Sequence, residues 1–196
     1  MMDLAKQNEL FDHAAPQEIL KWGWNTFRPE IALLSSFGTE SVVLLHMVSE
    51  ISPGMKVLFL ETGYHFPETL AYKKLLTEKL HLHVEDLTAS MPREEFVRAH
   101  GDNLYDKNPD LCCDINKVQP LKRALKGLRA WVSGIRRAQG PTRKDVHILE
   151  VYEGGLYKIN PITNWSTKDS WNYIREHDLP LHPLFEKGYA SIGCWP

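Results

Sequence analysis

Residues 31–46, with the sequence IALLSSFGTESVVLLH, place an apolar run, a loop of small residues and a helical pattern directly after one another. The run Ile31 to Leu34 is typical of a buried strand, because it is continuously apolar and has polar residues on both sides. Gly38 allows a sharp turn, and from Thr39 onward the apolar residues are spaced as in a helix. Strand, loop and helix in this order predict an α/β fold with a parallel sheet.

The loop between this strand and this helix has the composition of an anion site. Backbone N–H groups and the positive end of the helix dipole point into such a loop, where phosphate or sulfate can bind. Hydroxyl groups of Ser35, Ser36, Thr39 and Ser41 add further donors. The alternative is an ordinary strand–turn–helix junction that binds nothing. The loop lacks the lysine of a Walker A motif and the repeated glycines of GxGxxG.

A second strand and loop repeat this pattern. Lys56 to Leu60 is predicted to be a strand, followed by the loop Glu61 to Phe66 and a helix with Leu70, Leu75, Leu76 and Leu80 as its apolar stripe. Leu82 to Val84 is predicted to be a third, short strand. A strand–helix–strand unit implies parallel pairing, so the loops after the first two strands are expected at one edge of the sheet, where open α/β folds bind ligands.

The rest of the chain fits one domain with a short leading segment. We expect an N-terminal helical segment over residues 1–28 and a single α/β domain over residues 29–196. Further helices are predicted at residues 16–27, 92–99, 119–128 and 167–177, a strand at 130–133, a loop at 101–110, and a hairpin of residues 146–151 and 156–160.

Charge and composition restrict the partners. The 23 basic and 25 acidic residues give a net charge of −2, which argues against nucleic acid or a membrane surface as a partner. No apolar run reaches membrane-spanning length, and the N-terminus lacks the pattern of a signal peptide. Three cysteines are too few for a disulfide framework. We therefore expect a cytosolic protein.

The cysteines suggest a soft metal centre. Cys112 and Cys113 are adjacent, and a vicinal pair seldom forms a disulfide with itself. Together with Cys194 they could bind zinc or an iron–sulfur cluster, although three sulfurs leave either centre one ligand short. A CxxC pair interrupted after Cys194 would supply the missing ligand. Ordinary buried thiols remain the alternative.

A basic loop follows the predicted strand at 130–133. Residues 134–144, GIRRAQGPTRK, contain Arg136, Arg137, Arg143 and Lys144, and arginine side chains match the geometry of phosphate and sulfate oxygens. Lys117 lies four residues after Cys113 and could bring a cation near both the cysteines and an anionic substrate. A solvated basic loop and a surface lysine are the alternatives.

Taken together, these motifs resemble the assimilatory adenylylsulfate and phosphoadenylylsulfate reductases, which have the adenine nucleotide α-hydrolase-like (PP-loop) fold. The resemblance extends from about Trp22 onward. Its motifs are SSFGTES at 35–41, LETG at 60–63 with Glu61 in place of Asp, WVSGIRRAQGPTR at 131–143, and the cysteines Cys112, Cys113 and Cys194, the last within IGCWP. The cysteine pattern resembles the branch of the family that contains a 4Fe-4S cluster.

The resemblance implies thiol-dependent reduction of adenosine 5′-phosphosulfate to sulfite and AMP, a step of sulfate assimilation and cysteine biosynthesis. It implies attack on sulfur by a cysteine thiolate, and release of sulfite by thioredoxin or a similar dithiol. A homo-oligomer is compatible with it. Reduction of phosphoadenylylsulfate is the alternative within the family. An ATP-using PP-loop sulfurtransferase or ligase, and a non-catalytic nucleotide-binding module, are the alternatives outside it.

The resemblance also implies roles for individual residues. It assigns Cys112, Cys113 and Cys194 to the cluster, and Lys117 and Arg143 to charge neutralisation at the reacting group. The implied substrate-binding residues are Ser35, Ser36, Gly38, Thr39, Leu60, Thr62, Gly63, Gly134, Arg136 and Arg137. The family's nucleophile lies in a C-terminal ECG(L/I)H-type tail that this sequence lacks. We therefore expect a truncated chain that folds but does not turn over substrate.

Overall fold

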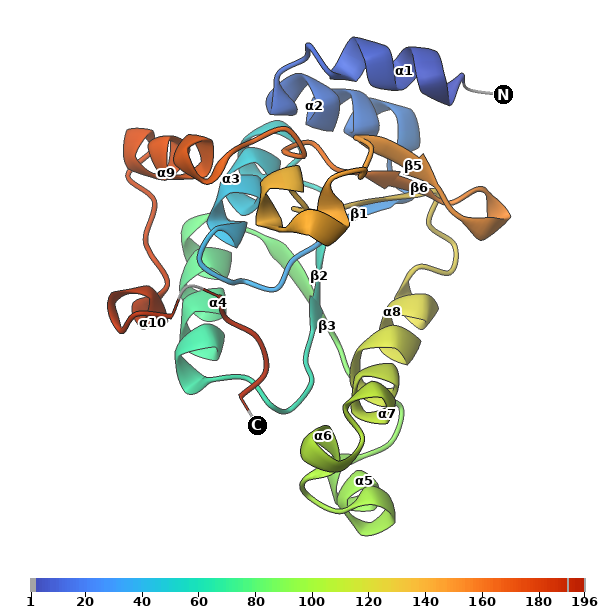
Figure 1. Ribbon diagram of the computed structural model, residues 1–196, viewed down its shortest axis with the longest axis vertical. Helices are drawn as coiled ribbons and strands as arrows, with labels where there is room; N and C mark the ends of the chain where they lie inside the picture. The colour runs from blue at the N-terminus through green and yellow to red at the C-terminus, as the bar shows by residue number, and fades with distance from the viewer. Residues whose placement is uncertain (1–2, 190, 196) are drawn as a thin grey trace.

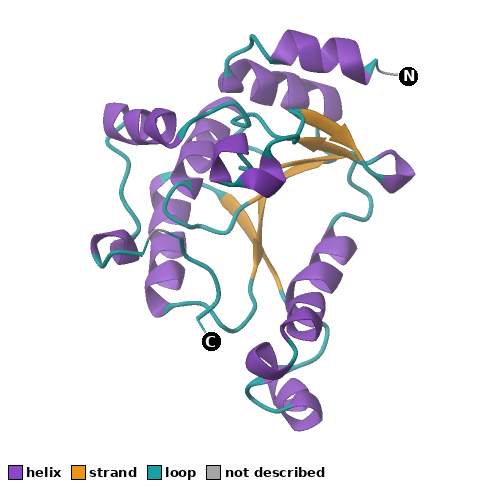
Figure 2. Cartoon of the chain, in the orientation of Figure 1, coloured by secondary structure: helices purple, strands orange, loops and turns teal. Residues whose placement is uncertain are grey.

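The computed structural model describes residues 3–189 and 191–195 and contains one six-stranded sheet with helices on both faces (Figures 1 and 2). The sheet order is β3-β2-β1-β4-β6-β5, in which only the pairing of β5 with β6 is antiparallel. The strands are β1 Ile31–Leu34, β2 Lys56–Leu60, β3 His83–Leu87, β4 Ala130–Val132, β5 Leu149–Val151 and β6 Tyr157–Ile159. The predicted α/β class and the parallel central strands are confirmed.

Most of the helices lie before β4 in the chain. They are α1 Leu4–Phe11, α2 Pro16–Phe27, α3 Ser41–Ile51, α4 Pro67–Lys79, α5 Arg93–His100, α6 Leu104–Lys107, α7 Pro109–Cys113, η1 Asp114–Val118 and α8 Gln119–Ala124. Later in the chain follow η2 Arg137–Gln139, η3 Pro141–Arg143, η4 Glu153–Gly155, α9 Thr167–Glu176 and α10 Pro183–Glu186. Among the described residues, none of these helices is long and apolar enough to cross a membrane.

Both faces of β1 are buried, which explains its continuous apolar sequence. Ile31 and Leu33 pack into the main core with residues of α2 and α3, such as Leu20 and Leu45. On the opposite face Ala32 packs with Leu58, Leu87 and the apolar side of α8. Strand β1 is therefore fixed between two layers, and the loop that leaves its carboxyl end has a rigid starting point.

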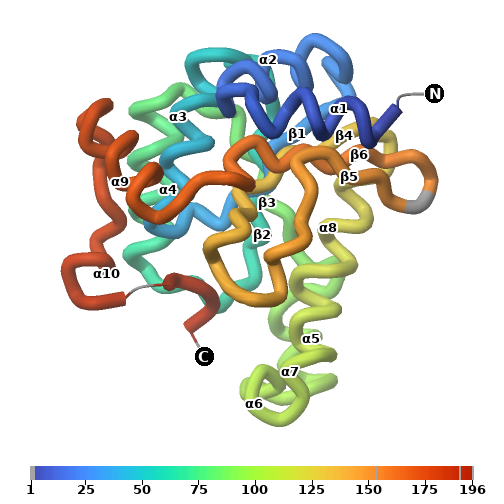
Figure 3. Tube along the Cα trace, turned by 45° about the horizontal axis from the view of Figure 1, so that its top comes forward, coloured from blue at the N-terminus to red at the C-terminus, as the bar shows by residue number. Residues whose placement is uncertain are grey.

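The segment from α5 to α7 forms an arm that extends from the sheet, as both the ribbon and the turned view show (Figures 1 and 3). A small second core holds it together, in which Phe96 and Leu104 pack against Tyr64 from the loop after β2. The prediction of an irregular loop over residues 101–110 is wrong here, because α6 and the start of α7 lie within it. This arm carries Cys112 and Cys113.

Two further predictions need correction. The apolar stripe predicted for α4 is half right: Leu76 is buried in the main core, and Leu80 packs against that core. Leu70 and Leu75 are instead 38% and 47% exposed, and Thr69 and Tyr72 are buried in their place. The third strand runs over His83–Leu87 and not over residues 82–84. Its polar sequence is held by pairing with β2 along five residues.

Candidate functional site

A cavity of about 590 Å³ lies at the carboxyl ends of β1, β2 and β4. Three segments surround it, together with Lys117 and residues 191–194: the serine loop (residues 35–40) after β1, the LETG segment (residues 60–63) after β2, and the arginine loop (residues 134–143) after β4. Because these strands are parallel neighbours, their carboxyl ends meet at one edge of the sheet, which is where open α/β folds bind ligands. We call this space the large cavity.

The serine loop is held in place from inside the core. Its left-handed residue is Phe37, with φ of 52°, and not Gly38 as the sequence suggested. Phe37 is fully buried and packs edge-to-face on Phe59 of β2, with ring centroids 5.5 Å apart. The Phe37 amide donates to Ser35 Oγ at 3.2 Å. These contacts fix the turn against the core, and the start of α3 faces the large cavity.

The arginine loop is joined to the serine loop by an ion pair. The guanidinium of Arg136, only 2% exposed, donates to the carboxylate of Glu40. Gln139 Oε1 accepts both the Arg136 backbone N–H, at 3.1 Å, and a hydrogen bond from Arg143 Nη1. These contacts hold Arg136 and Arg143 at the wall of the large cavity.

Arg137 has a different position. Its Nε donates to the carbonyl of Val146 at 2.9 Å, and its Nη1 donates to Asn164 Oδ1 at 2.5 Å. It is not among the described residues that line the large cavity. In the structure Arg137 braces the arginine loop against the segment that follows it.

Several buried polar atoms at the large cavity have no partner. In the described part of the chain, five buried side-chain N or O atoms lack a hydrogen bond, and four of them belong to residues that line this cavity. These four are Thr39 Oγ1, Glu40 Oε1, Trp131 Nε1 and Arg136 Nη1. Buried polar groups are nearly always paired in folded proteins, so this concentration indicates a site built for a polar ligand.

The LETG segment separates the large cavity from a second one. Leu60 and Thr62 line the large cavity, and His65 Nε2 donates to the Leu60 carbonyl at 2.7 Å. Gly63 has φ of 73°, donates its N–H to Glu61 Oε1, and is not among the described lining residues. Its role is to let the chain turn after β2, because this backbone conformation favours glycine.

The three cysteines line the second cavity, of about 300 Å³, which we call the cysteine cavity. Cys112 and Cys113 end α7, and Cys194 is held against the LETG segment by a β-bridge to His65 and by a 3.3 Å contact of its Sγ with Thr62 Oγ1. Over residues 3–189 and 191–195, no three His, Cys, Asp or Glu side chains are close enough to hold a single metal ion. Burial raises the pKa of the Cys112 thiol. Pro196, at the end of the IGCWP motif, lies outside the described residues.

Lys117 lies where the two cavities meet. It belongs to the π-helical turn η1, and with Thr62 and Cys194 it lines both cavities. Burial by itself would lower the pKa of its ammonium group, but the sulfurs of Cys194 and Cys113 outweigh burial and raise it. Lys117 therefore carries a positive charge between the cysteines and the large cavity.

The structure brings most of the proposed site residues to these two cavities. Lining the large cavity are Ser35, Ser36, Gly38, Thr39, Leu60, Thr62, Lys117, Gly134, Arg136, Arg143 and Cys194. Sequence reasoning did not assign several other lining residues to the site, among them Glu40, Trp131, Ser133 and Lys158. The first three lie inside motifs that were recognised, whereas Lys158 had no signal of its own.

The comparisons with known proteins agree with this geometry. Residues 30–196 match the family described as the phosphoadenosine phosphosulfate reductase domain. The chain is similar to adenosine 5′-phosphosulfate reductase of Salinibacter ruber, with 39% identity over 98% of this chain and 77% of that protein. It is also similar to phosphoadenosine 5′-phosphosulfate reductase of Gloeobacter violaceus, with 42% identity over 98% of this chain and 80% of that protein.

A solved structure has the same fold. The phosphate complex of phosphoadenylyl-sulfate reductase from Candida auris superposes with a TM-score of 0.84 and 33% identity, over 98% of this chain and 94% of that one. The family match covers most of the sequence, and both relatives exceed 30% identity over most of their own lengths. The chain belongs to the family of adenylylsulfate and phosphoadenylylsulfate reductases.

Proposed function

We propose that this chain is the substrate-binding and cluster-binding domain of a reductase that converts adenosine 5′-phosphosulfate to sulfite and AMP, in a thiol-dependent step of sulfate assimilation. The observation that carries the proposal is the convergence of the serine loop, Arg136 and Arg143 on one cavity that continues, past Lys117, into the cysteine cavity. A nucleotide with a 5′-phosphosulfate has two adjoining anionic groups, and this site offers cations beside an exposed helix start. The Candida auris relative is a phosphate complex, which fits an anion site in this fold.

The reaction follows from the charges at the site. A thiolate attacks the sulfur of the sulfate, the bond between that sulfur and the bridging oxygen breaks, and AMP leaves with the electron pair. The ammonium of Lys117 and the guanidinium of Arg143 offset the negative charge that develops during this step. The attack leaves an S-sulfocysteine. One thiolate of a dithiol such as thioredoxin then attacks the cysteine sulfur, and sulfite leaves with the electron pair of the S–S bond. The second thiol of the dithiol resolves the resulting mixed disulfide, which frees the enzyme thiol and leaves the dithiol as a disulfide. These thiol steps suit a reducing compartment, and we propose the cytosol.

We propose that Cys112, Cys113 and Cys194 bind a 4Fe-4S cluster. Three thiols that line one cavity, with a lysine beside them, are a suitable donor set, because such clusters are held by cysteine thiolates. When bound, the cluster would supply electrostatic stabilisation near the sulfate and would not exchange electrons in the step. The attacking thiolate is then none of the three cysteines of this chain. Residues 29–196 would form the reductase domain, preceded by the helical segment 1–28.

Phosphoadenylylsulfate is the second candidate substrate, because the Gloeobacter violaceus and Candida auris relatives bear that name. Titration calorimetry with adenosine 5′-phosphosulfate, phosphoadenylylsulfate and ATP tests the proposal. We expect the first nucleotide to bind most tightly, and replacement of Lys117 by Ala to weaken its binding more than that of AMP, which lacks the sulfate. Lys122→Ala, at an exposed position of α8, is the matched control.

An activity assay completes the test. Incubated anaerobically with thioredoxin and adenosine 5′-phosphosulfate, the 196-residue chain is expected to bind the nucleotide without releasing sulfite, because its three cysteines are assigned to the cluster. Preferential binding of ATP would contradict the proposed reaction. Sulfite release by this chain would contradict the assignment of its cysteines.

A further inference from the structure

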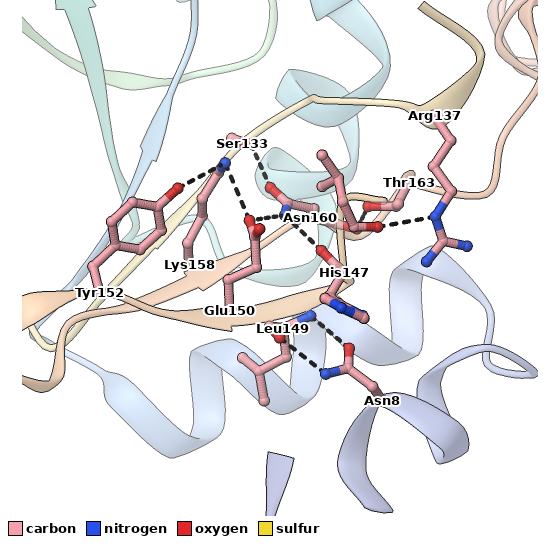
Figure 4. Close-up of polar contacts among 11 residues, drawn as sticks. Asn8, Ser133, Arg137, His147, Leu149, Glu150, Tyr152, Lys158, Asn160 and Thr163 are labelled. Carbon is pink, nitrogen blue, oxygen red and sulfur yellow. Dashed lines mark hydrogen bonds and ion pairs between the residues drawn. The ribbon is translucent and has the colours of Figure 1, made fainter. Parts of the chain in front are cut away.

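A polar network joins β5 and β6 to Ser133, which follows β4 (Figure 4). At its centre is Asn160, which follows β6 and is fully buried. Its Nδ2 donates to the carbonyl of His147 at 2.8 Å and to Glu150 Oε2 at 3.0 Å. Its Oδ1 accepts a hydrogen bond from Ser133 Oγ at 2.5 Å. Ser133 in turn lines the large cavity.

The orientation of the Asn160 amide is fixed by its partners. Both hydrogens of Nδ2 meet oxygens that can only accept, a backbone carbonyl and a carboxylate. The reversed amide would place Oδ1 against these two oxygens and leave a buried acceptor unpaired, which is costly. Glu150 forms an ion pair with Lys158, whose Nζ lies 3.2 Å from Glu150 Oε2 and 3.4 Å from the Tyr152 hydroxyl.

The orientation of this amide decides what Ser133 can bind. A serine hydroxyl has one proton, and here that proton is directed to Asn160 Oδ1. What remains on the cavity side is a lone pair. Ser133 Oγ can therefore accept a hydrogen bond from a ligand but cannot donate one, unless the buried Asn160 oxygen loses its partner. A phosphate or sulfate oxygen, which only accepts, is disfavoured at this position.

We propose that Ser133 Oγ accepts a hydrogen bond from a ribose hydroxyl of the bound nucleotide. This inference rests on the proposed function and specifies which group of the substrate Ser133 recognises. A nucleotide of adenosine has two kinds of donor, the ribose hydroxyls and the exocyclic amine of adenine. Ser133 lies three residues before Arg136, which lines the part of the cavity shared with the serine loop. The ribose is the group bonded to the 5′-phosphate, so its hydroxyls are the donors nearest to that part.

The test combines a substitution in the protein with deletions in the ligand. Binding of AMP, 2′-deoxy-AMP, 3′-deoxy-AMP and inosine 5′-monophosphate is measured by titration calorimetry for the wild type, Ser133→Ala and Ser133→Thr. We expect Ser133→Ala to weaken AMP binding about five- to tenfold, the size of one hydrogen bond. Ser133→Thr keeps the hydroxyl and should bind AMP nearly as the wild type does. Circular dichroism and thermal melting verify that each variant is folded.

The deoxy analogues test whether the group that donates to Ser133 is a ribose hydroxyl. One of the two deoxy analogues should bind to the wild type and to Ser133→Ala with equal affinity, because that analogue lacks the hydroxyl that would donate to Ser133. If Ser133→Ala weakens AMP and both deoxy analogues equally, or if the difference vanishes only for inosine 5′-monophosphate, the inference is wrong. Failure of the wild type to bind AMP at all would instead overturn the proposed function, so the two failures are distinguishable.

Discussion

Arg136 and Glu40 form an ion pair that joins the loop after β4 to the start of α3. Arg136 is 2% exposed and Glu40 29%, and one further polar atom of each side chain remains unpartnered at the large cavity. Arg136 needs Glu40 in this position, because an unpaired buried guanidinium is costly. The pair therefore sets the distance between two of the three segments that surround the cavity.

Replacement of Glu40 by Ala should lower the free energy of unfolding by about 2–3 kcal/mol, because it leaves the Arg136 guanidinium buried without its anionic partner. Urea denaturation measures this change. Glu85→Ala is the matched control, since Glu85 pairs with Lys56 where both side chains are about half exposed or more, and such pairs contribute less than about 1 kcal/mol. Equal losses for the two variants would contradict the structural role of the Arg136–Glu40 pair.

Replacement of Arg143 by Ala should weaken binding of AMP about tenfold or more, because Arg143 lines the large cavity and charge-assisted hydrogen bonds contribute about 1.5–3 kcal/mol. Lys144→Ala changes the net charge by the same amount at the neighbouring, exposed position. Titration calorimetry at two salt concentrations separates a direct contact from general attraction. The same loss of affinity in both variants would mean that Arg143 makes no specific contact.

Reconstitution with iron and sulfide under anaerobic conditions tests the role of the cysteines. We expect the wild type to retain both elements after desalting, and Cys113→Ser and Cys194→Ser to retain substantially less. Asp106→Asn is the control, because Asp106 lines the cysteine cavity without a thiol. Retention of iron in the cysteine variants at the wild-type level would rule out these residues as cluster ligands.

His182 makes stability depend on pH. It is fully buried, its Nδ1 accepts the Leu184 N–H at 3.1 Å, and its Nε2 therefore donates to Thr69 Oγ1. Burial lowers the pKa of His182, despite the opposing effect of Glu68. In the unfolded chain His182 has the ordinary histidine pKa of 6.5, and in the folded chain its pKa is lower. Below pH 6.5 the unfolded chain therefore binds more protons, so this stabilisation is complete above pH 6.5 and is lost as the pH falls.

Thermal melting between pH 7.5 and pH 5, both within about two units of the histidine pKa, measures this effect. His182→Asn can still cap Leu184 but takes up no proton, so its melting temperature should fall less on acidification than that of the wild type. His83→Gln, at an exposed position of β3, should follow the wild type. An unchanged acid response in His182→Asn would show that His182 does not titrate on unfolding.

The sequence predicted the elements that are buried on both faces or that carry a start signal within their own residues. Strands β1 and β2 and helix α2 have the predicted bounds, since an apolar run between two layers and an N-terminal proline leave clear patterns. Helix α1 was not located, because its anchor is tertiary: Asn8 exchanges two hydrogen bonds of 2.9 Å with Leu149 of β5. Such a contact over 141 positions has no local signal.

The residues of the site also fall into those that the sequence indicated and those that it did not. Short motifs indicated the serine loop, the arginine loop and the cysteines, because each carries its chemistry within a few residues. The partners that orient these groups could not be predicted, since they come from distant parts of the chain. Glu40 reaches Arg136 across 96 positions, and Asn160 reaches Ser133 across 27. Which arginine lines the cavity and which braces the loop follows only from such contacts.

A crystal structure of this protein with bound AMP tests the central claim most directly. The account predicts the 5′-phosphate at the start of α3, in contact with the serine loop and with Arg136 or Arg143, and a ribose hydroxyl within hydrogen-bond distance of Ser133 Oγ. AMP bound outside the large cavity, or with its phosphate away from the serine loop, would contradict it.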